Sequence, residues 1–263
     1  MNALNHWKLD GSDKDVVLYG GASYKKVQYN VSAALNLPGT AGSYATTPAV
    51  AIQSTSLTIA FWVKLYSSNS YYLYSYWLNP YIFNIGVRKA SEKVTIIYQS
   101  RKKSNTDLFI ARGGNVILNQ WTHVAVSWDR MTKQAKIFQD GIQIIQVTSA
   151  YSDLDLPNNI RSYFDVGFKR DSQTVINGAM RELVVFNRPL TSQEVMLLKD
   201  STAISGLAKS LGAWVGPTHH YINWAPVLQS NSNCVSARAW EPYQLDKVQC
   251  SETMEFICKK RFD

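Results

Sequence analysis

The chain has no apolar run of the roughly 18 to 20 residues that a membrane-spanning helix requires. Residues 1–7 also lack the apolar core of a secretory signal peptide. We therefore expect no membrane insertion by this segment, and, for a secreted protein, a mature form or part of a longer precursor. No Arg-Gly repeat, basic helix or zinc-finger spacing accompanies the two short basic clusters, residues 101–103 and 259–261, so nucleic acid is not an expected partner.

Residues that enzymes and metal sites need are also sparse. No two of the three cysteines have Cys-x-x-Cys spacing, so a zinc site is not expected. No serine stands in a nucleophile-elbow context. Glycoside hydrolysis needs two carboxylates that face one sugar, and Glu182 stands alone in its predicted strand. The sequence therefore predicts a non-enzymatic protein.

Positive charge exceeds negative charge, with a formal net charge of +8 and a pI of about 9.3. A basic balance favours acidic partners, and with nucleic acid set aside these include sulfated or other acidic glycans. The charges are scattered along the chain and not gathered in one segment. We expect the partner to be a glycan or an extracellular protein.

Short strands with alternating or wholly apolar side chains fill the chain from about residue 5 to residue 200. Asp140-Gly141 between two of them is a hairpin signal, because both turn positions tolerate a positive φ. Many strands without helices between them indicate an all-β fold, an antiparallel two-sheet sandwich. The predicted strands include 57–64, 81–87, 93–98, 107–111, 121–128, 136–139, 142–146 and 181–186.

One helix is predicted after the strands, over residues 192–199. Thr191 is a suitable N-cap, and Glu194 three residues later completes a capping box. Residues 201–210 are small and polar and are the best linker candidate. We therefore divide the chain into a domain over 1–200, a linker over 201–210 and a second unit over 211–263.

Several ordered motifs in the first unit resemble a known family. The motifs are His6-Trp7-Lys8-Leu9-Asp10-Gly11, the strands 34–37 and 57–63, the segment 119–129 with Trp121 and Trp128, and the closing segment 178–191. Together they resemble the laminin-G-like, concanavalin A-like jelly roll, a fold related to the pentraxins. The resemblance covers residues 5–200 and implies an extracellular recognition domain. Because the fold also houses β-glucanases, a concanavalin-like glycosidase is the weaker alternative.

Relatives of this fold often hold Ca²⁺ at one rim, so the resemblance also implies candidate ligands. A hard cation needs about six oxygens, supplied by carboxylates and carbonyls. The sequence establishes no cofactor, and a structural Ca²⁺ is the one candidate. The candidate ligands are Asp10, Asp13 and Asp15, or Asp153 and Asp155 with Asn158.

The densest aromatic run lies at residues 71–77. With a period of two, Tyr72, Tyr74 and Tyr76 share one face, and the opposite face is expected to be core. These three tyrosines are candidate ligand contacts, able to stack on sugar rings or on a protein. The alternative is that they stabilise cross-strand pairs within the sheet.

All three cysteines lie in the tail, where residues 223–226, Cys234, Cys250 and 255–259 resemble the C-terminal half of a C-type lectin-like domain. The resemblance implies a Cys234–Cys250 disulfide and leaves Cys258 unpaired or bonded to another chain. The positions matching the family's calcium-binding carboxylates, residues 228–230 and 245–247, do not carry them. We therefore expect no calcium-dependent sugar binding by this tail.

The sequence thus predicts a secreted or surface-exposed recognition or adhesion protein with a jelly roll and a degenerate, disulfide-bonded lectin-like tail. The sequon at Asn30 is a candidate glycosylation site. The alternative is a structural subunit of an extracellular assembly, a homo- or hetero-oligomer joined through the incomplete tail and Cys258.

Overall fold

A computed structural model describes residues 3–26, 33–52, 56–76, 83–101, 108–150, 154 and 163–211, and three tail segments, 234–237, 245–247 and 257–258. The chain divides into two compact units, residues 1–25 with 33–199, and residues 26–32 with 200–263. No described helix has the length and apolar character needed to span a membrane.

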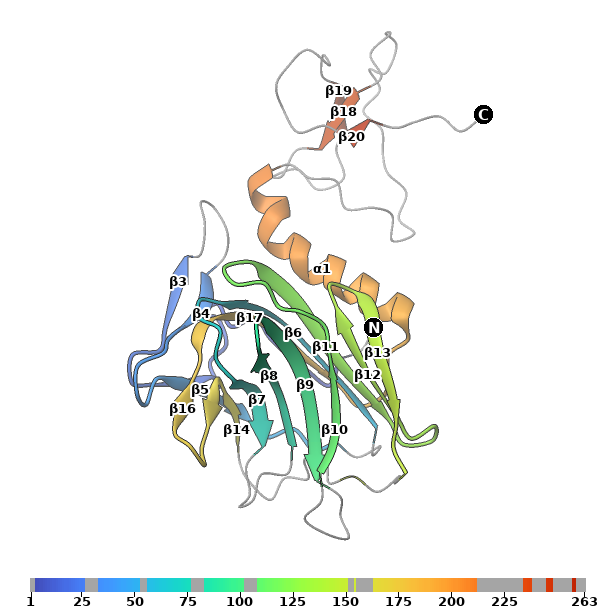
Figure 1. The fold of residues 1–263 in the computed structure, drawn as a ribbon. Coiled ribbons are helices and arrows are strands. Elements are labelled where there is room, and N and C mark those ends of the chain that lie inside the picture. Colours follow the sequence, from blue (N-terminus) through green and yellow to red (C-terminus); the bar gives the residue numbers. More distant parts are fainter. Residues whose placement is uncertain are drawn as a thin grey trace. The chain divides into compact units, whose positions relative to one another are not determined.

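The first unit is a sandwich of two antiparallel sheets, which confirms the predicted all-β architecture (Figure 1). One sheet contains β1 (Asn5–Trp7), β3 (Ser23–Lys26), β4 (Ala33–Pro38), β6 (Leu57–Leu65), β11 (Trp121–Asp129), β12 (Gln134–Gln139), β13 (Ile142–Thr148) and β17 (Asn177–Phe186). Its order is β13-β12-β11-β6-β17-β4-β3, with β1 paired to β17. We call it the eight-stranded sheet.

The other sheet is seven-stranded. It contains β2 (Val17–Tyr19), β5 (Tyr44–Pro48), β7 (Tyr71–Tyr76), β8 (Phe83–Ala90), β9 (Lys93–Arg101), β10 (Leu108–Gly113) and β14 (Tyr163–Val166). Its order is β10-β9-β8-β7-β14-β5-β2. A separate hairpin, formed by β15 (Phe168–Lys169) and β16 (Thr174–Val175), follows β14 in the chain.

The core lies between the two sheets and follows the alternation of their strands. Phe61 and Val63 of β6 and Val126 and Trp128 of β11 are each 0% exposed, as is Tyr98 of β9 on the facing sheet. Each apolar side chain buried in this way contributes roughly 1.5 to 3 kcal/mol. The apolar face predicted for residues 121–128 is therefore confirmed as a core face.

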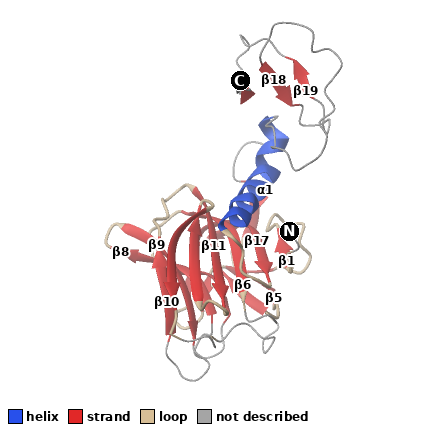
Figure 2. Ribbon diagram, turned by 90° about the vertical axis from the view of Figure 1, so that its right-hand side faces the viewer, coloured by secondary structure: helices blue, strands red, loops and turns tan. Residues whose placement is uncertain are grey.

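The outer face of the eight-stranded sheet is covered at one place by the start of α1 (Ser192–Leu211), as Figure 2 shows beside β17. The helix and the sheet face enclose a second apolar cluster, separate from the core between the sheets. It consists of Ala60, Ala125, Phe138, Val184, Phe186, Leu190, Val195 and Leu198. On the same face of β11, His123 is 1% exposed and its ring packs edge-on against Trp62. Burial lowers the pKa of His123 to about 3.

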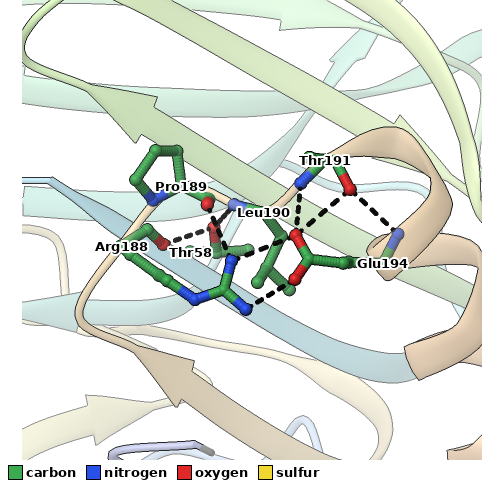
Figure 3. A network of polar contacts seen from close by, with 6 residues as sticks. All are labelled: Thr58, Arg188, Pro189, Leu190, Thr191 and Glu194. Atoms are coloured by element: carbon green, nitrogen blue, oxygen red, sulfur yellow. Dashed lines mark hydrogen bonds and ion pairs between the residues drawn. The ribbon is translucent and has the colours of Figure 1, made fainter. Parts of the chain in front are cut away.

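The capping box predicted for the helix is confirmed (Figure 3). The Glu194 backbone N–H donates to Thr191 Oγ1 at 3.2 Å, and the Thr191 backbone N–H donates to Glu194 Oε2 at 2.9 Å. Arg188 adds two bonds to the Glu194 carboxylate, at 3.0 and 2.6 Å, and these help to lower the pKa of Glu194 to about 2. Thr58 Oγ1 accepts the Leu190 N–H at 2.8 Å, which ties the turn before the helix to β6.

The helix continues beyond its predicted end at residue 199. It runs to Leu211, so the segment expected to be a linker, residues 201–210, is helical. The segment contains no proline, and its single glycine, Gly206, costs a helix only about 1 kcal/mol relative to alanine. Small polar residues therefore did not mark a helix end here.

The described part of the tail is one small antiparallel sheet, ordered β19-β18-β20. Its strands are β18 (Cys234–Ala237), β19 (Leu245–Lys247) and β20 (Ile257–Cys258), and Cys234 is the Cα partner of Cys258. Cys250 lies outside the described residues, and so do Asn30, Asp153, Asp155 and Asn158. The Cys234–Cys250 disulfide and the C-type lectin-like resemblance stay predictions.

Candidate functional site

A groove of about 500 Å³ lies on the outer face of the seven-stranded sheet. The outward side chains of neighbouring strands form its floor, with Asn84, Gly86 and Arg88 from β8 and Ile97 and Gln99 from β9. The hairpin β15–β16, including the turn between its two strands, forms one wall, and β10 contributes to the opposite side. The volume falls within the range of ligand-binding clefts.

A β-bulge in β7 decides which aromatic side chains reach this groove. Tyr72 pairs with Gly86 and Tyr74 pairs with Ile85, so two residues of β7 advance while β8 advances by one. Leu73 and Tyr74 are both 0% exposed as a result. Alternation therefore resets within the run, so that Tyr74 and Tyr76 point into the core.

The predicted ligand-contact face of Tyr72, Tyr74 and Tyr76 is therefore wrong for two of its three members. Tyr74 and Tyr76 are 0% exposed and pack on Phe164 with ring centroids 4.9 and 4.8 Å apart. The Tyr74 hydroxyl lies 3.2 Å from Thr47 Oγ1, and burial raises its pKa. Of these three tyrosines, Tyr72 alone lines the groove.

Gly86 keeps the centre of the floor open. A Cβ at this position would lie 2.4 Å from the backbone oxygen of Tyr71, so no other residue fits without a backbone shift. Beside it, Asn84 is 1% exposed, and its Nδ2 donates to Gln99 Oε1 at 3.0 Å. Asn84 Oδ1 has no hydrogen-bond partner among the described residues. The groove therefore holds an unused acceptor beside bare backbone.

The groove is positively charged. Arg88, Arg112 and Lys169 line it, and Asp171 is the one carboxylate among its described lining residues. Asp171 already pairs with Lys169 at 3.4 Å, and the Lys169 ammonium lies 5.3 Å from the centre of the Tyr72 ring. Neither Arg88 nor Arg112 has an ion-pair partner in the described part of the chain.

The wall is anchored by Arg170, the first residue of the turn between its two strands. Arg170 donates from Nε and Nη2 to the two oxygens of Asp165, both at 2.6 Å, and the Asp165 side chain is only 2% exposed. The guanidinium also lies 5.2 to 5.8 Å from the ring centres of Tyr44, Tyr163 and Phe168. Hydrogen bonding to Asp165 raises the pKa of Arg170, and the pair fixes the start of the hairpin to β14.

The three aspartates suggested as Ca²⁺ ligands near the N-terminus are occupied by local hydrogen bonds. Asp13 accepts the backbone N–H groups of Lys8 and Leu9 at 3.2 and 2.7 Å, and Asp15 accepts the indole N–H of Trp7 at 3.2 Å. Asp10 accepts from Ser12 at 2.6 Å. Among the described residues no three His, Cys, Asp or Glu side chains form a metal cluster, and a bound Ca²⁺ stays a prediction.

Apart from Tyr72, the residues that form this groove were not singled out from the sequence. The alternation Asn84-x-Gly86-x-Arg88 places them on one face of a strand, and this signal was available. Arg112 and Lys169 come from distant segments, and only the fold brings them to the same groove.

Comparison with known proteins identifies the family to which this fold belongs. Residues 38–196, more than half of the chain, match a laminin G family profile described as the concanavalin A-like lectin/glucanases superfamily. No curated protein sequence matches the chain.

Solved structures share the fold at low sequence identity. The binding domain of botulinum neurotoxin serotype G superposes with a TM-score of 0.62 and 16% identity over 80% of this chain and 53% of that one. Domain 4 of AbnA, a GH43 extracellular arabinanase from Geobacillus stearothermophilus, solved in complex with arabinotriose, gives a TM-score of 0.55 and 17% identity over 75% of this chain and 98% of that one.

A third similar structure is the ligand-binding domain of botulinum neurotoxin serotype D in complex with N-acetylneuraminic acid, with a TM-score of 0.56 and 11% identity over 76% of this chain and 50% of that one. This protein matches about half the length of both neurotoxin domains. The fold resemblance read from the sequence motifs is thereby confirmed, whereas the pentraxin relation stays a prediction. The chain belongs to the concanavalin A-like lectin/glucanases superfamily.

Proposed function

We propose that this protein is an extracellular, non-enzymatic recognition or adhesion protein whose jelly roll binds a glycan in the groove of the seven-stranded sheet. One observation carries the proposal: Asn84 Oδ1 is buried at the floor of a 500 Å³ groove and has no partner among the described residues. A buried acceptor left without a donor costs about 1 to 3 kcal/mol, and a sugar hydroxyl would supply the donor.

The other side chains of the groove suit a sugar ring. Tyr72 offers an aromatic surface, and Gln99 offers an amide next to that of Asn84. Two of the structurally similar domains were solved with saccharides, arabinotriose in one and N-acetylneuraminic acid in the other. Another was solved with rat synaptotagmin II, so a protein partner is the second candidate for this face.

The charge of the groove favours an acidic glycan. Arg88 and Arg112 have no described carboxylate partner, and Lys169 has only Asp171. A hydrogen bond from a guanidinium to a carboxylate or sulfate contributes about 1.5 to 3 kcal/mol. A carboxylated or sulfated sugar would therefore bind more tightly than a neutral sugar of the same size.

The described lining residues of the groove do not supply the carboxylate pair that hydrolysis needs. A glycosidase places two carboxylates on either side of the scissile bond, about 5 to 9.5 Å apart depending on mechanism. The described lining residues supply Asp171 alone, and that carboxylate is paired with Lys169. We therefore propose binding without catalysis; measurable hydrolysis of a β-glucan by the purified protein would contradict this.

The alternative of a structural subunit depends on a Cys258 that bonds to another chain. The register of β18 and β20 instead sets Cys258 opposite Cys234 of the same chain. Non-reducing electrophoresis separates these possibilities, since a band at twice the monomer mass that disappears on reduction would restore the assembly hypothesis.

A glycan array tests the proposal directly. Sialylated, uronic-acid, sulfated and neutral glycans are probed with the wild-type protein and with Arg88→Gln, with and without EGTA. Lys89→Gln is the matched control, because it removes one positive charge from the neighbouring residue, which does not line the groove. We expect acidic glycans to bind the wild type and the control, and Arg88→Gln to weaken binding roughly tenfold or more. Binding to no glycan, or equal binding by Arg88→Gln, would refute the proposal, and loss of binding in EGTA would show that Ca²⁺ takes part.

A further inference from the structure

A second hollow of about 400 Å³ lies beside the groove. It is lined by the turns around Gly39 and Asn69, by the end of the hairpin at Gln173, and by Asn177 at the start of β17. None of its described lining residues is charged, whereas the groove contains three cations. We call it the rim pocket.

The rim pocket and the groove are adjoining parts of one surface. Tyr71 and Thr174 line both of them. Tyr71 is 4% exposed, and its hydroxyl lies 2.6 Å from Ser67 Oγ, so this shared boundary is held in place. A ligand in the groove that is long enough to pass Thr174 would therefore reach the rim pocket.

The chemistry of the rim pocket differs from that of the groove. Asn69 and Asn177 present amide groups without hydrogen-bond partners among the described residues, and Thr174 adds a hydroxyl. Gly39 has a φ of +76°, and a Cβ there would lie 2.8 Å from Asn177 Cβ, so bare backbone keeps this side open. Neutral amides beside bare backbone match the hydroxyl groups of an uncharged sugar and carry no positive charge to attract a second anion.

From this contrast we infer that the rim pocket is a second saccharide subsite, which holds a neutral sugar linked to the acidic sugar in the groove. The inference rests on the proposed function of the groove. It specifies the ligand class: an oligosaccharide of at least two units, one carboxylated and the next uncharged. The acidic unit contacts Arg88 and Arg112, and the neutral unit contacts Asn69 and Asn177.

Calorimetric titration with matched probes tests the inference. One arm compares N-acetylneuraminic acid with sialyllactose, and the other compares glucuronic acid with a hyaluronan disaccharide; lactose is the neutral reference. In the arm whose acidic sugar binds, we expect the longer probe to bind about tenfold more tightly, because one or two added hydrogen bonds are worth roughly that factor. Lactose should bind more weakly than either.

Two variants separate the subsites. Asn69→Ala should reduce the affinity for the longer probe to about that for the acidic sugar alone and leave the acidic sugar unaffected. Arg112→Gln should weaken both. Gln143→Ala, which removes an exposed amide on β13, is the control and should change neither.

The outcomes distinguish the two proposals. If the acidic sugar binds but the longer probe binds no more tightly, or if Asn69→Ala leaves the longer probe unaffected, the rim pocket is not a subsite and the groove proposal survives. If neither acidic sugar nor either longer probe binds, both proposals fail together.

Discussion

Removing the guanidinium of Arg170 should both destabilise the domain and weaken glycan binding. In Arg170→Ala the Asp165 carboxylate, 2% exposed, loses two hydrogen bonds of 2.6 Å. Breaking a buried ion pair from one side costs about 3 to 5 kcal/mol, because the remaining buried charge loses its counter-charge. The Arg170 side chain is 23% exposed, so water can partly replace it, and we expect a loss of about 3 kcal/mol.

Urea denaturation measures this loss. For a slope of about 2 kcal/mol per molar urea, a loss of 3 kcal/mol lowers the unfolding midpoint by roughly 1.5 M. Domains of this kind have a stability of about 5 to 15 kcal/mol, so the variant should remain folded in buffer. Arg170→Lys keeps the charge but not the forked geometry and should fall between the wild type and Arg170→Ala.

A double variant tests whether the lost stability comes from the buried Asp165 charge. Asp165→Asn combined with Arg170→Ala removes both charges of this pair, so it should be more stable than Arg170→Ala alone. A loss below 1 kcal/mol for Arg170→Ala, or a double variant less stable than either single one, would refute the reasoning. Because the hairpin β15–β16 lines the groove and the rim pocket, Arg170→Ala should also lower the affinity for an acidic glycan.

Three further experiments have clear expected outcomes. Gly86→Ala places a Cβ 2.4 Å from the Tyr71 carbonyl oxygen, so we expect a loss of about 1 to 3 kcal/mol by thermal melting and a weakened glycan contact. His123 is neutral in the fold, with a pKa lowered to about 3, and the unfolded chain binds more protons below its ordinary pKa of 6.5. Stability should therefore fall by roughly 2 kcal/mol between pH 7 and pH 5, and His123→Gln should flatten this part of the pH profile. Non-reducing peptide mapping should recover Cys234 joined to Cys250, the disulfide that the lectin-like resemblance implies; recovery of Cys234 joined to Cys258, its Cα partner across β18 and β20, would refute this.

The features that could be predicted from the sequence are those set by local signals. The apolar alternation of residues 121–128 and the strand 57–63, apolar except for Thr58, fix two core strands, β11 and β6, whatever surrounds them. Thr191 and Glu194 form their capping box within a single turn. Such signals involve neighbours only, so the sandwich and the start of its helix followed from them.

The aromatic run shows where local signals end. Strict alternation placed Tyr72, Tyr74 and Tyr76 on one face, and the bulge opposite Gly86 moved two of them into the core. Whether a strand bulges depends on its partner, here on a glycine 14 positions later (86 − 72). The sequence of β7 alone carries no sign of that partner.

The groove, like the bulge, depends on contacts between segments that are distant in the sequence. Its cations lie at positions 88, 112 and 169, scattered among other charges along the chain, and a composition with a net charge of +8 does not tell which of them meet. The fold selects these three, pairs one with Asp171, and leaves Arg88 and Arg112 without described partners. Like charges held close together raise each other's energy unless an anion lies between them. The net charge alone already favoured an acidic partner, but only the assembled sheet face shows which cations would meet one, and an acidic ligand would relieve their repulsion on binding.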